Sequence, residues 1–233
     1  NDVVEIVELE KNRQILELFH GPTLAFKDVA MQLLGSLLDH FAKEQGKKIA
    51  VLGATSGDTG AAAISACSRH ANVQVFILYP HNKVTDIQRR QMTTSGSGNV
   101  HPLAIESDFD GCQSLVKKIF LDKDFHIDST RFIAANSINW ARCMTQSVYY
   151  FWTYLRLKQQ LKELTFSVPS GNFGNIFSAR VAAYMGLPID QLHLVTNAND
   201  ILHRTITSGK MKMAKVHRTY SPSMDIQISS NFE

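Results

Sequence analysis

One lysine stands where it could act as a nucleophile. The segment from Phe19 to Asp28 reads FHGPTLAFKD, a Gly/Pro-rich turn that delivers Lys27 to the expected opening of a helix. The N-terminal end of a helix is unfavourable for a cation, so an ordinary surface lysine gains nothing there. A lysine that gives up its proton easily is a good nucleophile towards an aldehyde. The alternative is a solvated lysine beside the acidic residue Asp28.

Two glycine-rich turns could bind anions. They are Thr55 to Gly60, which reads TSGDTG, and Ser170 to Asn175, which reads SGNFGN. Each stands between an expected strand and an expected helix, where glycines let backbone N–H groups converge on a phosphate or a carboxylate. Neither turn is a Walker A loop or a GxGxxG motif. Each alone could be a tight turn, but two at the carboxyl ends of strands favour a common ligand-binding face.

A fourth candidate is Asn136 to Asn139, which reads NSIN, together with Arg142. Ser137 or Ile138 and Arg142 are four to five residues apart. On a helix, their polar groups would therefore face one point and could bind an anion. The alternative is that Asn136 or Ser137 only caps the helix.

The composition is that of an ordinary globular protein. The 233 residues are 44% hydrophobic and 19% charged, and the formal net charge is +3. The basic residues are scattered, which predicts neither nucleic-acid nor membrane binding. No apolar run reaches the ~20 residues of a membrane span. A small molecule is therefore the expected partner, and no obligate protein partner is inferred.

The cysteines and histidines do not predict a metal site. Cys67, Cys112 and Cys143 are far apart and form no CxxC pair, which argues against disulfides and zinc. The histidines that we considered, among them His20 and His81, lack metal-ligand spacing. We expect reduced thiols and a cytoplasmic location.

Short β-rich runs alternate with helical patterns, which is typical of α/β proteins with parallel strands. The expected strands are 14–18, 49–52, 73–79, 100–105, 131–134, 164–168 and 192–195. The expected helices are 29–46, 61–66, 115–120, 138–161 and 176–185. The nearly continuous apolar run 73–79 suits the middle of a sheet. The aromatic run 149–154 predicts burial on more than one face, and 83–90 is interpreted as a solvated helix face.

At the four candidate places the chain resembles the threonine synthase family. The segment from Leu16 to Asp28, LELFHGPTLAFKD, is similar to that family's cofactor-lysine segment. Ala54 to Gly60, Ala135 to Asn139 and Val168 to Asn175 also match, in the family's order. The resemblance covers almost the whole chain. The lysine motif is highly specific, whereas the SGDTG-type loop alone would admit related enzymes.

The resemblance implies the fold type II architecture of pyridoxal-phosphate (PLP) enzymes, which is similar to the tryptophan synthase β chain and has open parallel sheets in two domains. Residues 1–22 and 146–233 would be parts of a large PLP-binding domain, and 23–145 a smaller inserted α/β domain. The resemblance also implies that the chain is a fragment that lacks N- and C-terminal parts, among them the residue that contacts the pyridine nitrogen. We therefore expect this piece alone to be inactive.

The resemblance further implies a role for each candidate residue. Lys27 would be the catalytic residue and would hold PLP as a Schiff base. The cofactor phosphate would be bound by Gly171, Asn172, Phe173, Gly174 and Asn175. The substrate carboxylate would be bound by Ser56, Gly57, Asp58 and Thr59, and the substrate phosphate by Asn136, Ser137 and Arg142. Asp58 stands where sister families often have an asparagine beside the phenolic oxygen of PLP, and an ionised Asp58 would repel that oxygen.

The implied activity is that of threonine synthase, a carbon–oxygen lyase of threonine biosynthesis that converts O-phospho-L-homoserine and water into L-threonine and phosphate. Two alternatives remain open at this point. One is a related threonine or serine dehydratase-type lyase, which needs no site for a substrate phosphate. The other is a non-catalytic PLP-binding homologue. A plain phosphate- or nucleotide-binding module would leave the lysine motif unexplained.

Overall fold

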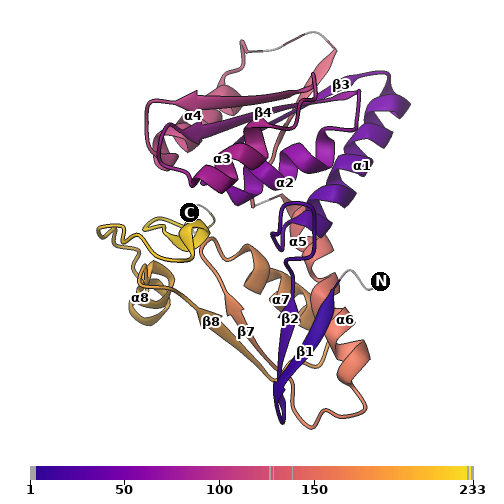
Figure 1. Cartoon of the computed structure of the whole chain (residues 1–233), viewed down its shortest axis with the longest axis vertical. Coiled ribbons are helices and arrows are strands. Elements are labelled where there is room, and N and C mark those ends of the chain that lie inside the picture. Colours follow the sequence, from indigo (N-terminus) through magenta and orange to yellow (C-terminus); the bar gives the residue numbers. More distant parts are fainter. Residues whose placement is uncertain (1–3, 126, 128, 138, 230, 232–233) are drawn as a thin grey trace. The chain divides into compact units, whose positions relative to one another are not determined.

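The computed structural model describes residues 4–125, 127, 129–137, 139–229 and 231 (Figure 1). The chain forms two compact units, each of which is described by itself. The first unit is Leu18–Asn139. The second unit combines Asp2–Glu17 with Trp140–Glu233. The second unit is therefore built from two stretches of chain that flank the first.

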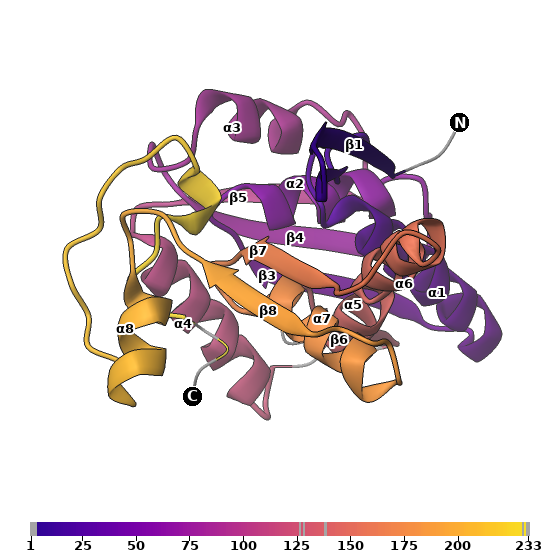
Figure 2. The same ribbon diagram turned by 90° about the horizontal axis from the view of Figure 1, so that it is seen from below.

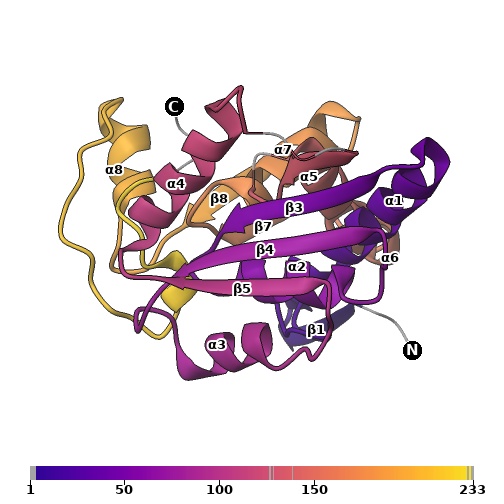
Figure 3. The same cartoon turned by 90° about the horizontal axis from the view of Figure 1, so that it is seen from above.

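The first unit is built on a four-stranded parallel sheet. Its strands are β3 (Lys48–Ala54), β4 (Val73–Pro80), β5 (Val100–Ile105) and β6 (Thr130–Ala134), in the order β5-β4-β3-β6. Figure 3 shows β3, β4 and β5 side by side. All neighbouring strands are parallel. The two inner strands carry the apolar core, which confirms the predicted central position of 73–79.

Helices cover both faces of this sheet. They are α1 (Asp28–Gln45), α2 (Asp58–Cys67), α3 (Asp86–Thr93) and α4 (Phe109–Leu121). In Figure 1, α1, α2 and α3 lie along one side of the sheet. The chain passes from β3 to β4 to β5 in one direction across the sheet, and the connection from β5 through α4 to β6 runs in the opposite direction. Because such connections are right-handed, α4 lies on the opposite face of the sheet from α2 and α3. There Cys112 and Val116 pack on Leu52 and Leu78 of the sheet.

The second unit contains an antiparallel hairpin and a parallel strand pair. The hairpin consists of β1 (Glu5–Glu10) and β2 (Arg13–Glu17). The pair β7 (Thr165–Pro169) and β8 (Gln191–Val195) lies side by side in Figure 2 and is joined through α7 (Gly174–Tyr184). The remaining helices are α5 (Trp140–Gln146), α6 (Val148–Leu157), α8 (Ile201–Ser208) and the short 3-10 turn η1 (Pro222–Met224).

The predicted single helix 138–161 is wrong: two helices, α5 and α6, stand in its place, and α6 ends at Leu157. They are separated at Ser147. Its hydroxyl donates to the carbonyl of Met144 at 2.6 Å, and its N–H is shared between the carbonyls of Cys143 and Met144 at 3.3 and 3.2 Å. Such back-bonding by serine competes with the regular helical hydrogen bonds. Ile138, where the helix was expected to begin, lies outside the described residues.

Within the aromatic run, Tyr149 and Tyr150 are buried, whereas Phe151, Trp152 and Tyr154 are half-buried. Tyr149 and Tyr150 are only 2% and 3% exposed. The sequence analysis predicted neither β1, whose alternation includes several glutamates, nor α8 nor the 3-10 helix η1. Of the described helices, none is long and apolar enough to cross a membrane.

Candidate active site

Lys27 stands at the opening of α1, as the sequence predicts. It is the N-cap residue of that helix, and only 13% of its side chain is exposed. Its Nζ lies 3.1 Å from Oδ2 of Asp58 and 4.7 Å from the centre of the Phe26 ring. The ion pair offsets the unfavourable position of a cation at a helix N-terminus. The alternative of a solvated lysine is therefore wrong.

The turn that presents Lys27 is held by Asp28, which is 2% exposed. Its carboxylate accepts hydrogen bonds from the N–H and hydroxyl of Thr23, at 2.9 and 2.5 Å, and from the N–H of Ala25 at 3.3 Å. A Cβ at Gly21 would collide with this side chain. From the sequence alone, Asp28 was interpreted only as an acidic neighbour of Lys27. The structure shows that it fixes the lysine-bearing turn.

The loop Thr55–Gly60 is held from within by Thr55, which is 2% exposed. Its Oγ1 accepts the N–H groups of Gly57 and Gly60, both at 2.9 Å. Gly57 has φ 141°, a conformation that side chains rarely adopt. Asp58 then opens α2, at the helix end that favours an anion.

The segment after β6 lies at the same edge of the sheet as this loop, because β3 and β6 are parallel neighbours. The N–H of Ala135 donates to the carbonyl of Leu52 at 3.0 Å. Oδ1 of Asn136 is buried and has no hydrogen-bond donor among the described residues. A buried oxygen in that state is suited to accept from a ligand. Asn136 and half-buried Ser137 thus stand at the same sheet edge as the predicted carboxylate loop.

Gln88 of α3 is a residue that sequence reasoning missed. Its Nε2 donates to Oδ1 of Asp58 at 2.7 Å, and its side chain is buried. The prediction that 83–90 forms a solvated helix face is therefore wrong at this position. Thr85 and Gln88 form a capping box at the start of α3, which turns the glutamine amide inward. The Thr-x-x-Gln spacing was the available signal.

Arg142 lies on α5 in the second unit and is 2% exposed. Burial lowers the pKa of its guanidinium to about 10. A buried guanidinium is stabilised by a nearby anion. Asn136 and Ser137 belong to the first unit, so the convergence of these three residues stays a prediction.

The loop Gly171–Asn175 leads into the N-terminus of α7. Phe173 is the N-cap residue with φ 59°, a left-handed conformation. The first N–H groups of a helix have no partner within the helix and form an anion site. Directly before the loop, Oγ of Ser170 is buried and has no partner among the described residues. A helix N-terminus and a buried hydroxyl thus lie at the two ends of this loop, and its role as a phosphate site stays a prediction.

Two side chains support the Gly171–Asn175 loop from outside it. The hydroxyl of Tyr150 reaches Asn175, and Nδ2 of Asn231 donates to the carbonyl of Asn172 at 2.6 Å. Burial raises the pKa of Tyr150, so its hydroxyl stays protonated and can donate. The sequence predicted Tyr150 only as a core aromatic, and nothing in the sequence singled out Asn231.

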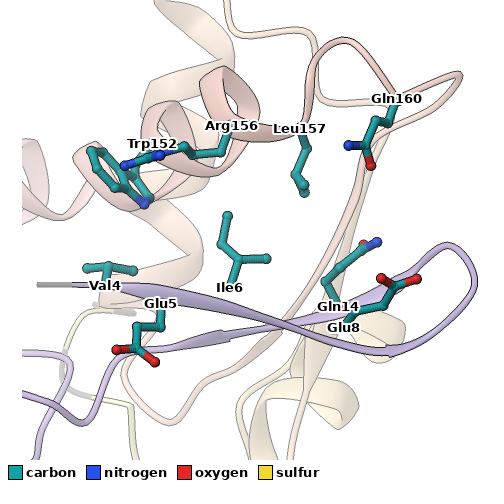
Figure 4. A pocket seen from close by; sticks show the side chains of 9 residues that line it. All are labelled: Val4, Glu5, Ile6, Glu8, Gln14, Trp152, Arg156, Leu157 and Gln160. Atoms are coloured by element: carbon teal, nitrogen blue, oxygen red, sulfur yellow. The ribbon is translucent and has the colours of Figure 1, made fainter. Parts of the chain in front are cut away.

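A pocket of about 520 Å³ lies elsewhere in the second unit (Figure 4). Hairpin residues such as Ile6 face Trp152 and Leu157 across it, and the guanidinium of Arg156 stacks on the Trp152 ring at 4.3 Å. None of the predicted site residues lines this pocket.

Residues 15–233 match the family model described as pyridoxal-phosphate dependent enzyme. The chain belongs to this family. The match confirms the predicted α/β class and the fold type II architecture of PLP-dependent enzymes.

Among similar proteins, the resemblance to threonine synthases is confirmed. A threonine synthase from Pseudomonas aeruginosa is 53% identical over 231 residues, which are 99% of this chain and 49% of that protein. The structure of PLP-bound threonine synthase from Brucella melitensis is 54% identical, with a TM-score of 0.87 over 99% of this chain and 49% of that one. The Escherichia coli threonine synthase structure is 38% identical, with a TM-score of 0.89 over 98% and 53%. The present chain thus spans about half the length of these relatives.

Proposed function

We propose that the protein is a threonine synthase, which uses PLP to convert O-phospho-L-homoserine and water into L-threonine and phosphate. The observation that carries this proposal is the position of Lys27, a shielded amine at the opening of α1, 3.1 Å from Asp58 of the TSGDTG loop. The similarity to named threonine synthases supports the reaction class. Because the chain spans about half of those relatives, turnover is proposed for the whole protein.

The residues present fit PLP. Lys27 would bind its aldehyde carbon, and the N–H groups of Gly171–Asn175 would bind its phosphate, with the buried hydroxyl of Ser170 as a further donor. When bound, PLP withdraws electrons from Cα of an attached amino acid. The protein then has to position the substrate, exclude water and move protons.

Lys27 is the proton carrier in this proposal. Its amine would take a proton from Cα of the substrate and then one from Cβ, and would return protons at Cγ, which becomes the methyl group, and at Cα, while water supplies the hydroxyl at Cβ. For this it must lose the charge that Asp58 stabilises in the pair. The hydroxyls of Ser56 and Thr59 and the N–H groups of the loop would hold the substrate carboxylate. Asp58 is itself an anion, so we assign it to Lys27 and not to the substrate carboxylate.

The substrate phosphate would be bound by Asn136, Ser137 and Arg142. The guanidinium offers a fixed fork of donors to a phosphate, and its burial strengthens the attraction. These groups would also stabilise the negative charge of phosphate as it leaves. A dehydratase-type lyase does not need them, and the relatives above do not favour that alternative.

The test is a pair of variants at Arg142 in the whole protein. Arg142→Met should raise KM for phosphohomoserine at least about 30-fold, since loss of a buried charge-assisted pair costs roughly 2–5 kcal/mol. Arg142→Lys keeps the charge but not the fork, so a smaller increase is expected. The Kd for PLP should change little in both variants.

Equal losses of substrate and cofactor affinity would mean that Arg142 supports the fold and does not bind the substrate phosphate. Release of 2-oxo acid from threonine or serine, without turnover of phosphohomoserine, would favour the dehydratase alternative. No turnover of any substrate by protein that binds PLP would favour a non-catalytic homologue.

We also propose a cytoplasmic location, as the sequence predicts from its cysteines.

A further inference from the structure

The carboxylate of Asp58 is shared between two donors on different helices. Oδ2 faces Nζ of Lys27 at 3.1 Å, and Oδ1 accepts Nε2 of Gln88 at 2.7 Å. A carboxylate held at both oxygens has little freedom to rotate. The side chain of Asp58 is therefore oriented by Gln88 as well as by the lysine.

Gln88 is in turn held at its other end. Its Oε1 accepts the N–H of Thr85 at 3.2 Å and the hydroxyl of Thr85 at 3.0 Å. Because those donors occupy the amide oxygen, the NH₂ group is the end that points at Asp58. Gln88 also lies against Gly57, where any Cβ would overlap its amide. The glutamine thus touches both the TSGDTG loop and the aspartate that follows Gly57.

The two helix ends act in opposite senses on the proton that Lys27 and Asp58 share. Lys27 is at the N-terminus of α1, which disfavours a cation, and Asp58 is at the N-terminus of α2, which favours an anion. Asp28 on α1 directs its carboxylate to Thr23 and Ala25. On α3, the exposed carboxylate of Asp86 pairs with Arg89. Asp58 is thus an anion in direct contact with the Lys27 amine.

We propose that Gln88 is a positioning residue that acts through Asp58: by fixing the carboxylate, it sets the pH at which Lys27 loses its proton. An asparagine at position 58 could still accept from Gln88 but would not carry a charge for the lysine. Gln88 therefore tunes how readily the lysine amine loses its proton, and it does so through Asp58. This inference rests on the proposed function only for its use in the reaction, because the ion pair exists in the protein without cofactor.

The experiment measures Lys27 in cofactor-free protein. Competitive acetylation over a pH series, read by mass spectrometry of the Lys27 peptide, gives the midpoint of its deprotonation, and Lys43 in the same sample is the internal reference. Asp58→Asn should lower the Lys27 midpoint by about one pH unit or more, since an opposite charge at this distance shifts a titration by that order. Gln88→Met, which keeps the length but removes the donor, should lower it by about half a unit.

The matched control is Gln91→Met. Gln91 lies on the same helix and donates to the carbonyl of Thr23 at 3.2 Å, so it supports the lysine turn without touching Asp58. We expect the Lys27 midpoint of this variant to match the parent. In the double variant with Asp58→Asn, Gln88→Met should add nothing further, because its effect passes through the aspartate.

Three outcomes would overturn the inference. They are an unchanged Lys27 midpoint in folded Gln88→Met, an equal shift in Gln91→Met, and full additivity in the double variant. These readouts need neither PLP nor substrate. If the Lys27 midpoints shift as expected but the protein has no threonine synthase activity, this inference stands and the proposed function is refuted. If the protein is active but the midpoints do not shift, the proposed function stands and this inference is refuted.

Discussion

The hydroxyl of Tyr150 on α6 donates to both oxygens of Asn175, at 2.6 Å to Oδ1 and at 3.0 Å to the backbone carbonyl. The ring is buried and packs edge-on against Phe166 of β7 at 4.9 Å. The first turn of α7, which carries the predicted phosphate site, is thereby tied to α6 and β7. Loop and helix form a preorganised unit, so little ordering is needed when an anion binds.

Tyr150→Phe should weaken this tie while leaving the ring packing intact. We expect the free energy of unfolding to fall by about 1–3 kcal/mol, because an oxygen of Asn175 loses its donor. The affinity for PLP should fall as well, since the loop is less ordered. Denaturant unfolding and PLP titration measure the two effects. The control is Tyr184→Phe, whose exposed hydroxyl accepts a surface hydrogen bond from Arg180. Equal effects of both changes would contradict the assigned role.

Gly171→Ala should weaken PLP binding while leaving the free energy of unfolding nearly unchanged. A Cβ at this position would lie 3.4 Å from Cδ1 of Ile226 and 3.5 Å from Cα of Met224, which is ordinary contact. We therefore expect the free energy of unfolding to change by less than about 1 kcal/mol. Gly171 belongs to the predicted phosphate site, so an added methyl there should lower the affinity for PLP. Unchanged affinity would show that the phosphate does not approach Gly171.

Cys67 makes stability depend on pH in the alkaline range. Burial raises the pKa of its thiol from the ordinary 9.0 to about 12. The folded state therefore keeps a proton that the unfolded chain loses, and stability is complete below the ordinary value and falls as pH rises towards the folded one. Cys67→Ala removes this dependence.

The measurement is urea unfolding of parent and Cys67→Ala protein at rising pH. The stability difference between them should shrink by about 1 kcal/mol between roughly pH 8 and pH 10. Cys112, Cys143 and Arg142 titrate alike in both proteins, so their contributions cancel in the difference. A pH-independent difference would mean that the Cys67 thiol is not shielded from water.

Local patterns predicted the sheet and the loops, because both depend on near neighbours in sequence. Apolar runs such as 73–79 fixed the inner strands, and the glycines of Thr55–Gly60 and Ser170–Asn175 marked the turns after strands. The helix opening at Lys27 followed from the Gly/Pro-rich turn before it. The placement of the Asn136 segment beside the Thr55 loop needed the sheet order, which parallel pairing of β3 and β6 supplies.

Long-range contacts could not be predicted in this way. Gln88 and Asp58 are 30 residues apart, and nothing in a solvated-looking helix indicated that one amide turns inward. The burial of Asp28 depends on how the preceding turn folds back on it. The break at Ser147 depends on a single hydroxyl that bonds its own helix, which a hydrophobic pattern does not register.

The central claim is that Lys27 binds the cofactor, and borohydride reduction tests it most directly. Reduction makes the bond between a lysine amine and PLP permanent, and mass spectrometry of the digested protein then locates the added phosphopyridoxyl group. We predict that the group is found on Lys27, and that Lys27→Ala protein carries none and forms no threonine. The group on another lysine, or turnover by Lys27→Ala protein, would contradict the account.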